Sequence, residues 1–281
     1  MITNGILDYE LNIIKSRILD IETNSIDLKR ILQEFLSRES KLIRPLSACL
    51  FFKALGENIS DEQFKILTAT EIVHNASLIH DDVIDGSILR RGKSTINYKY
   101  DNKLSVIAGD FLISKAIDEL LKLGNNDVLK LYFETISKMC EGESYQYFQK
   151  DKIPTLEEYL KKTQYKTAEL FKACFVSMSL YSKFQCINLA KDFAINFGIA
   201  FQIKNDLDDY RIGVENSQDI KDGIYTVPVI YANSTENNIT AIEKTLSLIH
   251  NYCERLKLLI KDFKDNEYKN YLIEIIDSIC K

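Results

Sequence analysis

The 281-residue chain has little of what interrupts a helix, since it contains 10 glycines and 3 prolines. Chains built from many short strands need a higher density of these turn residues, so a β-sandwich, a propeller or a collagen-like chain is not expected. Hydrophobic residues make up 46% of the sequence, enough for a substantial buried core. The composition predicts a globular protein of one large domain or two modest ones.

An excess of positive charge and long apolar runs are absent as well. The sequence has 36 basic and 41 acidic residues, so it has no general footprint for nucleic acid. No apolar run approaches the roughly 18 residues of a membrane-spanning helix, and the N-terminus lacks the pattern of a signal peptide. We therefore expect a cytoplasmic protein with no transmembrane segment and no nucleic-acid partner.

Cysteine and histidine patterns typical of metal sites are missing too. The six cysteines form no Cys-x-x-Cys pair and mostly lie in apolar helical stretches, which predicts reduced, buried thiols. Three histidines are too few for a histidine-rich zinc site. A zinc centre and a disulfide framework are therefore not expected.

What the sequence does contain is apolar residues at helical spacing along most of its length. Ser60 and Gln63 have the spacing of a capping box at a helix start. No repeat or linker divides the chain, so we predict a single all-α domain over residues 1–281. The expected helices cover residues 5–22, 26–38, 44–55, 61–84, 103–122, 126–149, 156–182, 188–210, 226–232, 238–262 and 266–279. Segments 86–102 and 211–225 break the pattern, and each directly follows an acidic cluster.

The first acidic cluster comprises Asp81, Asp82 and Asp85 at the end of an expected apolar helix. The i, i+4 spacing of Asp81 and Asp85 places two carboxylates on one face, near the negative end of the helix dipole. This placement is unfavourable without a cation, and oxygen ligands without cysteine or histidine favour Mg²⁺, which commonly shares its coordination with substrate phosphates. A solvated acidic helix end produces the same pattern, so this cluster alone does not decide between the two.

A second cluster, Asn205, Asp206 and Asp209, follows another apolar helical run. Asp206 and Asp209 are three residues apart and share a helix face. If both clusters face one cavity, Mg²⁺ could bridge their carboxylates to a diphosphate and make it a leaving group. Basic residues that suit phosphate contacts accompany the clusters. They are Lys41, Arg44, Arg90, Arg91, Lys93, Lys166 and Lys204.

These residues, in this order, make the chain similar to the trans-polyprenyl diphosphate synthase (polyprenyl synthetase) family of the medium- or long-chain type, from about Lys41 to Pro228. The segment SLIHDDVIDGSILRRGKST resembles the first aspartate-rich motif of the family, and FGIAFQIKNDLDDY resembles the second. AGDFL, CEGE and DIKDGIYTVP resemble further family segments. The resemblance implies a single-domain antiparallel helix bundle around a deep central cavity, a homodimer, and Mg²⁺-dependent joining of isopentenyl diphosphate to an allylic diphosphate.

The resemblance also implies roles for individual residues. The implied isopentenyl diphosphate site comprises Lys41, Arg44, His74 and Arg91, the allylic diphosphate site Arg90, Lys166, Thr167 and Gln202, and the metal sites Asp81, Asp82, Asp85, Asp206 and Asp209. The residues expected to act most directly in catalysis are Asp81, Asp82, Asp85, Arg90, Lys166, Gln202 and Asp206. On spacing alone, His74 would be interpreted as a core histidine.

Three departures from the family pattern bear on these expectations. Asn205 stands where the family has the first aspartate of its second motif, which removes one negative charge but keeps an oxygen ligand. Ile224 stands where many members carry a lysine, and Lys221 is a candidate substitute. The segment Glu39–Leu42 lacks the glycine pair and one arginine of the family motif, so the geometry around its lysine is expected to differ.

Ala76 and Ser77 lie one helical turn before Asp81, where short-product members of the family often carry an aromatic residue. Their small size predicts a product of C20 or longer, and close helix packing is an alternative explanation for it. The other functions left open are a class I terpene cyclase, a peptide prenyltransferase on the same fold, and a subunit of a heteromeric synthase. Asp209 and Gly213 occupy the Ser and Glu positions of a cyclase NDxxSxxxE motif, which argues against the cyclase.

Overall fold

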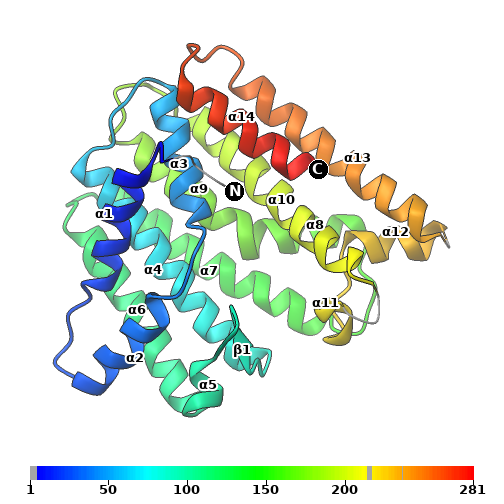
Figure 1. Cartoon of the computed structure of the whole chain (residues 1–281), viewed down its shortest axis with the longest axis horizontal. Helices are drawn as coiled ribbons and strands as arrows, with labels where there is room; N and C mark the ends of the chain where they lie inside the picture. Colours follow the sequence, from blue (N-terminus) through cyan, green and yellow to red (C-terminus); the bar gives the residue numbers. More distant parts are fainter. Residues whose placement is uncertain (1–4, 214–216, 236) are drawn as a thin grey trace. The chain divides into compact units, whose positions relative to one another are not determined.

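The computed structural model describes residues 5–213, 217–235 and 237–281, which are almost entirely helical (Figure 1). The all-α prediction is therefore confirmed. The chain divides into two compact units, one formed by Met1–Lys53 and Glu57–Leu129 and the other by Ala54–Gly56 and Lys130–Lys281. We call them unit 1 and unit 2 and describe each by itself; the single domain stays a prediction.

The helices of unit 1 follow the expected boundaries, except for the short α5, which lies in the segment 86–102 that was expected to be irregular. They are α1 (Asp8–Leu19), α2 (Ile26–Leu36), α3 (Ile43–Ala54), α4 (Asp61–Ile84), α5 (Ile96–Lys99) and α6 (Asn102–Leu121). The predicted capping box starts α4, because the Gln63 main-chain N donates to Ser60 Oγ over 3.2 Å and the Ser60 N donates to Gln63 Oε1 over 2.9 Å. Helix α4 packs mainly against α6 and also against α1, which buries most of its length.

A two-stranded hairpin in unit 1 replaces part of the irregular segment expected at 86–102. Strand β1 (Leu89–Arg90) pairs antiparallel with β2 (Lys93–Ser94). The two turn residues, Arg91 and Gly92, have φ angles of 52° and 72°. Positive φ at both central positions is the requirement of the tight turn that suits strand twist. Arginine is an unusual first residue for such a turn, which is why the sequence did not predict the hairpin.

The helices of unit 2 also match the prediction, with one interruption. They are α7 (Asn126–Phe148, which begins in unit 1), α8 (Leu156–Thr163), η1 (Gln164–Ala168), α9 (Glu169–Ser179), α10 (Ile187–Arg211), α11 (Gln218–Lys221), α12 (Val227–Thr235), α13 (Asn238–Leu259) and α14 (Glu267–Cys280). The single helix expected over 156–182 is divided by η1, a π-helical turn, and the expected irregular segment 211–225 contains α11.

Aromatic rings hold α9 against α10 in the core of unit 2. Phe171 lies 5.5 Å from Phe197, and Phe175 lies 5.7 Å from Phe193, between ring centroids. Pairs at such distances are worth about 0.5–1.5 kcal/mol beyond the area that they bury. This packing fixes α10, which carries the second acidic cluster at its C-terminal end.

The cysteines are free, as predicted, but not all of them are buried. Cys49, Cys174, Cys186 and Cys253 are buried, whereas Cys140 is exposed on α7 and Cys280 is partly exposed on α14, so the prediction was wrong for these two. In the described parts of the chain, no helix combines the length and the apolar character needed to cross a membrane.

Candidate active site

The first acidic cluster, in unit 1, contains one buried aspartate and two that are more exposed to solvent. Asp81 and Asp82 belong to the last turn of α4, and Asp85 caps it. The Asp82 side chain is 2% exposed and accepts a hydrogen bond of 2.7 Å from Arg90 Nε. Asp81 is half-buried and Asp85 is exposed. Asp82 therefore holds the arginine, and Asp81 and Asp85 are the more accessible members of the cluster.

Arg38, which follows the C-terminal end of α2, supports the Asp82–Arg90 pair, and the sequence did not predict it. Its Nη2 donates to the main-chain oxygen of Ser94 over 2.8 Å, and its guanidinium lies 5.1 Å from the ring centroid of Phe35. Burial raises the pKa of Asp82, and the charges of Arg90 and Arg38 oppose this rise. Arg38 thus ties α2 to the hairpin that carries Arg90.

Three of the four residues expected at the isopentenyl diphosphate site interact in unit 1. Burial is the main cause that lowers the pKa of the His74 imidazole well below its ordinary value, and the charges of Arg44 and Arg91 lower it further. His74 is therefore neutral. The same two arginines oppose the effect of burial, which raises the pKa of the nearby Glu71. Glu71 is therefore the acidic neighbour of this group, and it was not predicted.

The fourth residue, Lys41, is exposed and lies between Ser40 and Leu42. Leu42 has a φ of 45°, in the left-handed region that favours glycine. Ser40 donates a hydrogen bond of 3.5 Å to Glu71 Oε1. The departure of this segment from the family pattern thus coincides with an unusual backbone conformation beside the basic group.

In unit 2, Asp206 is the centre of a hydrogen-bonded chain that includes two other predicted residues. Its carboxylate, 4% exposed, accepts hydrogen bonds from the Tyr159 hydroxyl and, over 2.7 Å, from Gln202 Nε2. Thr167 Oγ1 in turn donates to Gln202 Oε1 over 3.1 Å. Burial raises the pKa of Asp206, and Lys162 lowers it. Gln202 therefore couples Thr167 to the carboxylate.

The other residues of the second cluster lie on the surface side of α10. Asp209 accepts hydrogen bonds from the Ser217 hydroxyl and, over 3.3 Å, from the Gln218 main-chain N. Asn205 is exposed. Asp219, on α11, has its pKa raised to about 7 by burial and by the negative charges of Asp206 and Asp209. Three carboxylates thus share one region of unit 2.

Lys166 lies within the π-helical turn η1 and forms an ion pair with Glu143 on α7. Two glycines allow neighbouring helices to approach this turn closely. A Cβ on Gly142 would lie 2.6 Å from the main-chain N of Lys166, and one on Gly198 would lie 2.7 Å from the Cα of Ala168. π-Helical turns occur frequently at functional sites, and this one carries both Lys166 and Thr167.

Comparison with known proteins identifies the family. A family model described as "Polyprenyl synthetase" matches residues 26–262. The chain belongs to the polyprenyl synthetase family. It is 32% identical to a "Prenyl transferase" of Cyanidium caldarium, with 91% of this chain and 90% of the relative covered. It is 30% identical to a "Decaprenyl-diphosphate synthase" of Dictyostelium discoideum, with 88% of this chain and 61% of the relative covered.

The fold agrees with this membership. The structure of a heptaprenyl diphosphate synthase from Staphylococcus aureus superimposes on this polyprenyl synthetase with a TM-score of 0.89 at 23% identity, covering 98% of each chain. At that identity the likeness concerns the fold. The predicted family and fold class are confirmed, and the names of the relatives do not favour a terpene cyclase or a peptide prenyltransferase.

The donor set of this polyprenyl synthetase fits a hard divalent cation. Both clusters offer carboxylate oxygens, which such a cation prefers, and Asp206 is buried with a raised pKa, a position that a nearby cation would stabilise. Among residues 5–213, 217–235 and 237–281, no three His, Cys, Asp or Glu side chains converge tightly enough to hold a metal by themselves. Mg²⁺ suits such a sparse set, because it commonly keeps waters and takes phosphate oxygens as further ligands.

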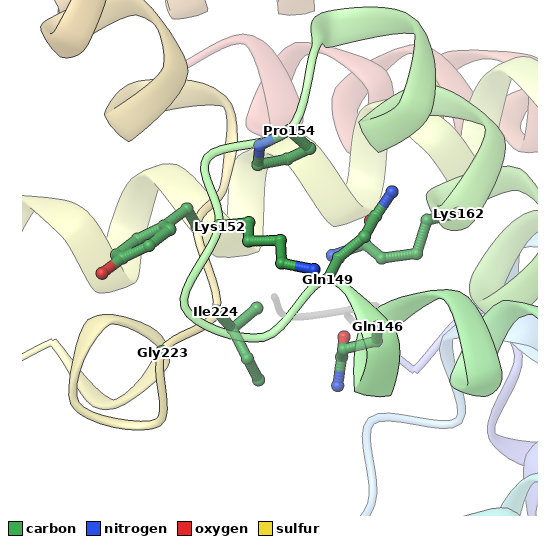
Figure 2. A pocket seen from close by; sticks show the side chains of 8 residues that line it. Gln146, Gln149, Lys152, Pro154, Lys162, Gly223 and Ile224 are labelled. Atoms are coloured by element: carbon green, nitrogen blue, oxygen red, sulfur yellow. The ribbon is translucent and has the colours of Figure 1, made fainter.

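Sequence reasoning missed Arg38, Glu71, Tyr159, Lys162 and Asp219. None of them belongs to an aspartate motif, and each acts through a partner distant in sequence, such as Tyr159 on Asp206. Lys162 gave no usable signal, because a lysine pair near the end of an amphipathic helix normally indicates an exposed surface, yet Lys162 is buried. It lines a pocket of unit 2 together with Ile224 (Figure 2).

Proposed function

We propose that this polyprenyl synthetase condenses isopentenyl diphosphate with an allylic diphosphate and releases a polyprenyl diphosphate of C20 or longer. The family match over residues 26–262 carries the proposal. The name of the Dictyostelium relative, a decaprenyl diphosphate synthase, supports a long product, and so do the small residues Ala76 and Ser77.

The proposed roles of the residues follow their environments. Isopentenyl diphosphate is assigned to Lys41, Arg44, His74 and Arg91, the allylic diphosphate to Arg90, Lys166, Thr167 and Gln202, and the metal to Asp81, Asp82, Asp85, Asp206 and Asp209. Neutral His74 can donate one hydrogen bond to a phosphate oxygen without adding charge. The buried contact of Asp82 with Arg90 supports a positioning part for Asp82 beside any ligation.

The proposed reaction needs no protein nucleophile. Mg²⁺, when bound, would neutralise the diphosphate and make it a better leaving group. Lys166 and Arg90 stabilise the negative charge that develops on the departing oxygens. The double bond of isopentenyl diphosphate attacks the allylic carbocation, and the released diphosphate takes the proton that is lost. The hydrogen bond of Thr167 to Gln202 orients the Gln202 amide, whose Nε2 is directed to Asp206.

We also propose that the enzyme is a cytoplasmic homodimer that acts without a second kind of subunit. Incubation of the purified chain with Mg²⁺ and both substrates, followed by mass determination of the extracted product, tests the function. Product formed from the allylic diphosphate alone would identify a cyclase instead. Activity that appears only after addition of a different chain would identify a heteromeric synthase.

A further inference from the structure

Lys162 is a buried lysine in the last turn of α8 that the roles above do not use. Its side chain is 8% exposed, and burial lowers the pKa of its ammonium group. Within the described part of the chain, the ammonium forms no hydrogen bond and no ion pair; its contact is with the ring of Tyr159, 5.1 Å from the centroid. A buried charge without a direct partner is costly, so its presence calls for a compensating ligand.

Charges from four elements of unit 2 surround Lys162. Asp206 on α10, Asp219 on α11 and Glu143 on α7 attract it, whereas Lys166 on η1 repels it. None of the three carboxylates is close enough to form an ion pair with it. The ammonium therefore lies beside Lys166 and the second acidic cluster with its hydrogen-bonding capacity unused.

A pocket of unit 2 with polar and apolar lining residues lies beside the Lys162 ammonium group. Figure 2 shows Lys162 and Lys152 extending into it, with Gln146 and Gln149 beside them and Ile224 on the loop that faces them. The pocket holds about 210 Å³, part of it open solvent. Ammonium and amide groups donate hydrogen bonds to phosphoryl oxygens, so the two lysines and two glutamines of this lining suit a phosphoryl group rather than a prenyl chain.

We propose that Lys162 is a second ammonium ligand of the allylic diphosphate, next to Lys166, and that it binds one phosphoryl group from the pocket that it shares with Ile224. This inference rests on the proposed function. It also accounts for the isoleucine at position 224, because a cation supplied from α8 on one side of the pocket makes a cation on the opposite loop unnecessary. Lys221, exposed on α11, is not among the residues that line the pocket.

Binding of inorganic diphosphate in the presence of Mg²⁺, measured by calorimetry on the whole chain, tests the inference without requiring turnover. We expect Lys162→Met to weaken binding by about tenfold to a hundredfold, the scale of one hydrogen bond to a charged group. Lys161→Met is the matched control, because Lys161 is the exposed neighbour whose ammonium faces Tyr145. We expect the control to bind diphosphate as the unmodified chain does.

Moving the positive charge from position 162 to position 224 distinguishes a ligand-binding role of Lys162 from a structural one. The double variant Lys162→Met/Ile224→Lys should recover most of the lost affinity, because both side chains line one pocket. The single variant Ile224→Lys, which retains Lys162, should bind diphosphate more tightly than the unmodified chain. A counter-ion that only stabilises Asp206 and Asp219 would not be replaced from the loop.

Three results would overturn the inference: unchanged diphosphate affinity in a folded Lys162→Met chain, no recovery in the double variant, or no gain in Ile224→Lys. A melting temperature lowered in Lys162→Met with unchanged affinity would instead assign Lys162 to the support of Asp206 and Asp219. Failure of the proposed function has a different signature, since the unmodified chain would then bind diphosphate yet make no polyprenyl product.

Discussion

Replacement of Gly142 by alanine should misplace Lys166 while leaving its charge intact. The added Cβ would lie 2.6 Å from the main-chain N of Lys166, 3.0 Å from its Cα and 3.1 Å from the carbonyl carbon of Tyr165. All three are main-chain atoms, so no side-chain rotation relieves the overlap. Ordinary contact requires 3.4–4 Å, so α7 and the π-helical turn must separate by 3.4 − 2.6 = 0.8 Å or more.

The size of the effect follows from this displacement. Overpacking of this kind costs about 1–3 kcal/mol of the free energy of unfolding. A misplacement of about 1 Å in an active site can reduce the rate on the order of 10²-fold. Because Lys166 is proposed to act on the charge of the departing diphosphate, we expect the loss mainly in kcat, with a smaller change in the KM of the allylic diphosphate.

Steady-state kinetics and thermal unfolding of Gly142→Ala, with Gly124→Ala as control, check this prediction. Gly124 lies in the turn before α7 with a φ of 62°, and nothing lies within 4 Å of an added Cβ. Alanine there is strained by about 1–2 kcal/mol but touches no other residue. Comparable loss of stability in both variants, with loss of kcat in Gly142→Ala alone, is the expected result. Equal kcat values in the two variants would refute the reasoning.

Three further predictions concern the acidic clusters and the product. Asp81→Ala should lower turnover about 10²- to 10³-fold even at saturating Mg²⁺, whereas Glu62→Ala, exposed at the other end of the same helix, should not; near-normal turnover would remove Asp81 from the mechanism. Ser77 is partly exposed, so Ser77→Phe should shorten the product measured by mass spectrometry, and an unchanged product length in the folded variant would contradict the size argument. Ala76 is fully buried, so Ala76→Phe should instead lower the free energy of unfolding by about 1–3 kcal/mol. The folded-state pKa of Asp219, about 7, lies above the ordinary 3.8, so the folded chain holds this proton more tightly. The metal-free chain should therefore lose stability as pH rises from about 4 to about 7, and Asp219→Asn should lose less; identical pH profiles in urea unfolding would contradict this.

Helical periodicity and capping residues were sufficient to predict the long helices, but not the short α5 and α11. The capping box at Ser60 begins α4 as expected, because the signal and its effect lie within four residues of each other. Interruptions inside helices were not predictable in the same way. The π-helical turn at Gln164–Ala168 depends on the close approach of α7 and α10 at Gly142 and Gly198, which are distant in sequence.

Site residues that belong to a local sequence motif were predictable, whereas those that act through a partner distant in sequence were not. The spacing of the aspartates indicated a cation site, but it could not show that Asp82 is turned inward to Arg90. Likewise, a lysine-rich helix end such as LKKT normally indicates an exposed surface, and the burial of Lys162 depends on α10, α11 and the loop at Ile224. The orientation of Asp82 and the burial of Lys162 both depend on tertiary packing, which local sequence patterns do not reveal.

The hydrogen bond from Arg38 to strand β2 ends on a main-chain oxygen, and this determines which substitutions the segment can accept during evolution. Any residue at position 94 offers the same main-chain carbonyl, so this hydrogen bond does not restrict the residue type at that position. Position 38 is restricted, because a lysine there would lack the planar group that stacks on Phe35. In a library that randomises both positions, we expect arginine to be retained at 38 while many residue types are recovered at 94.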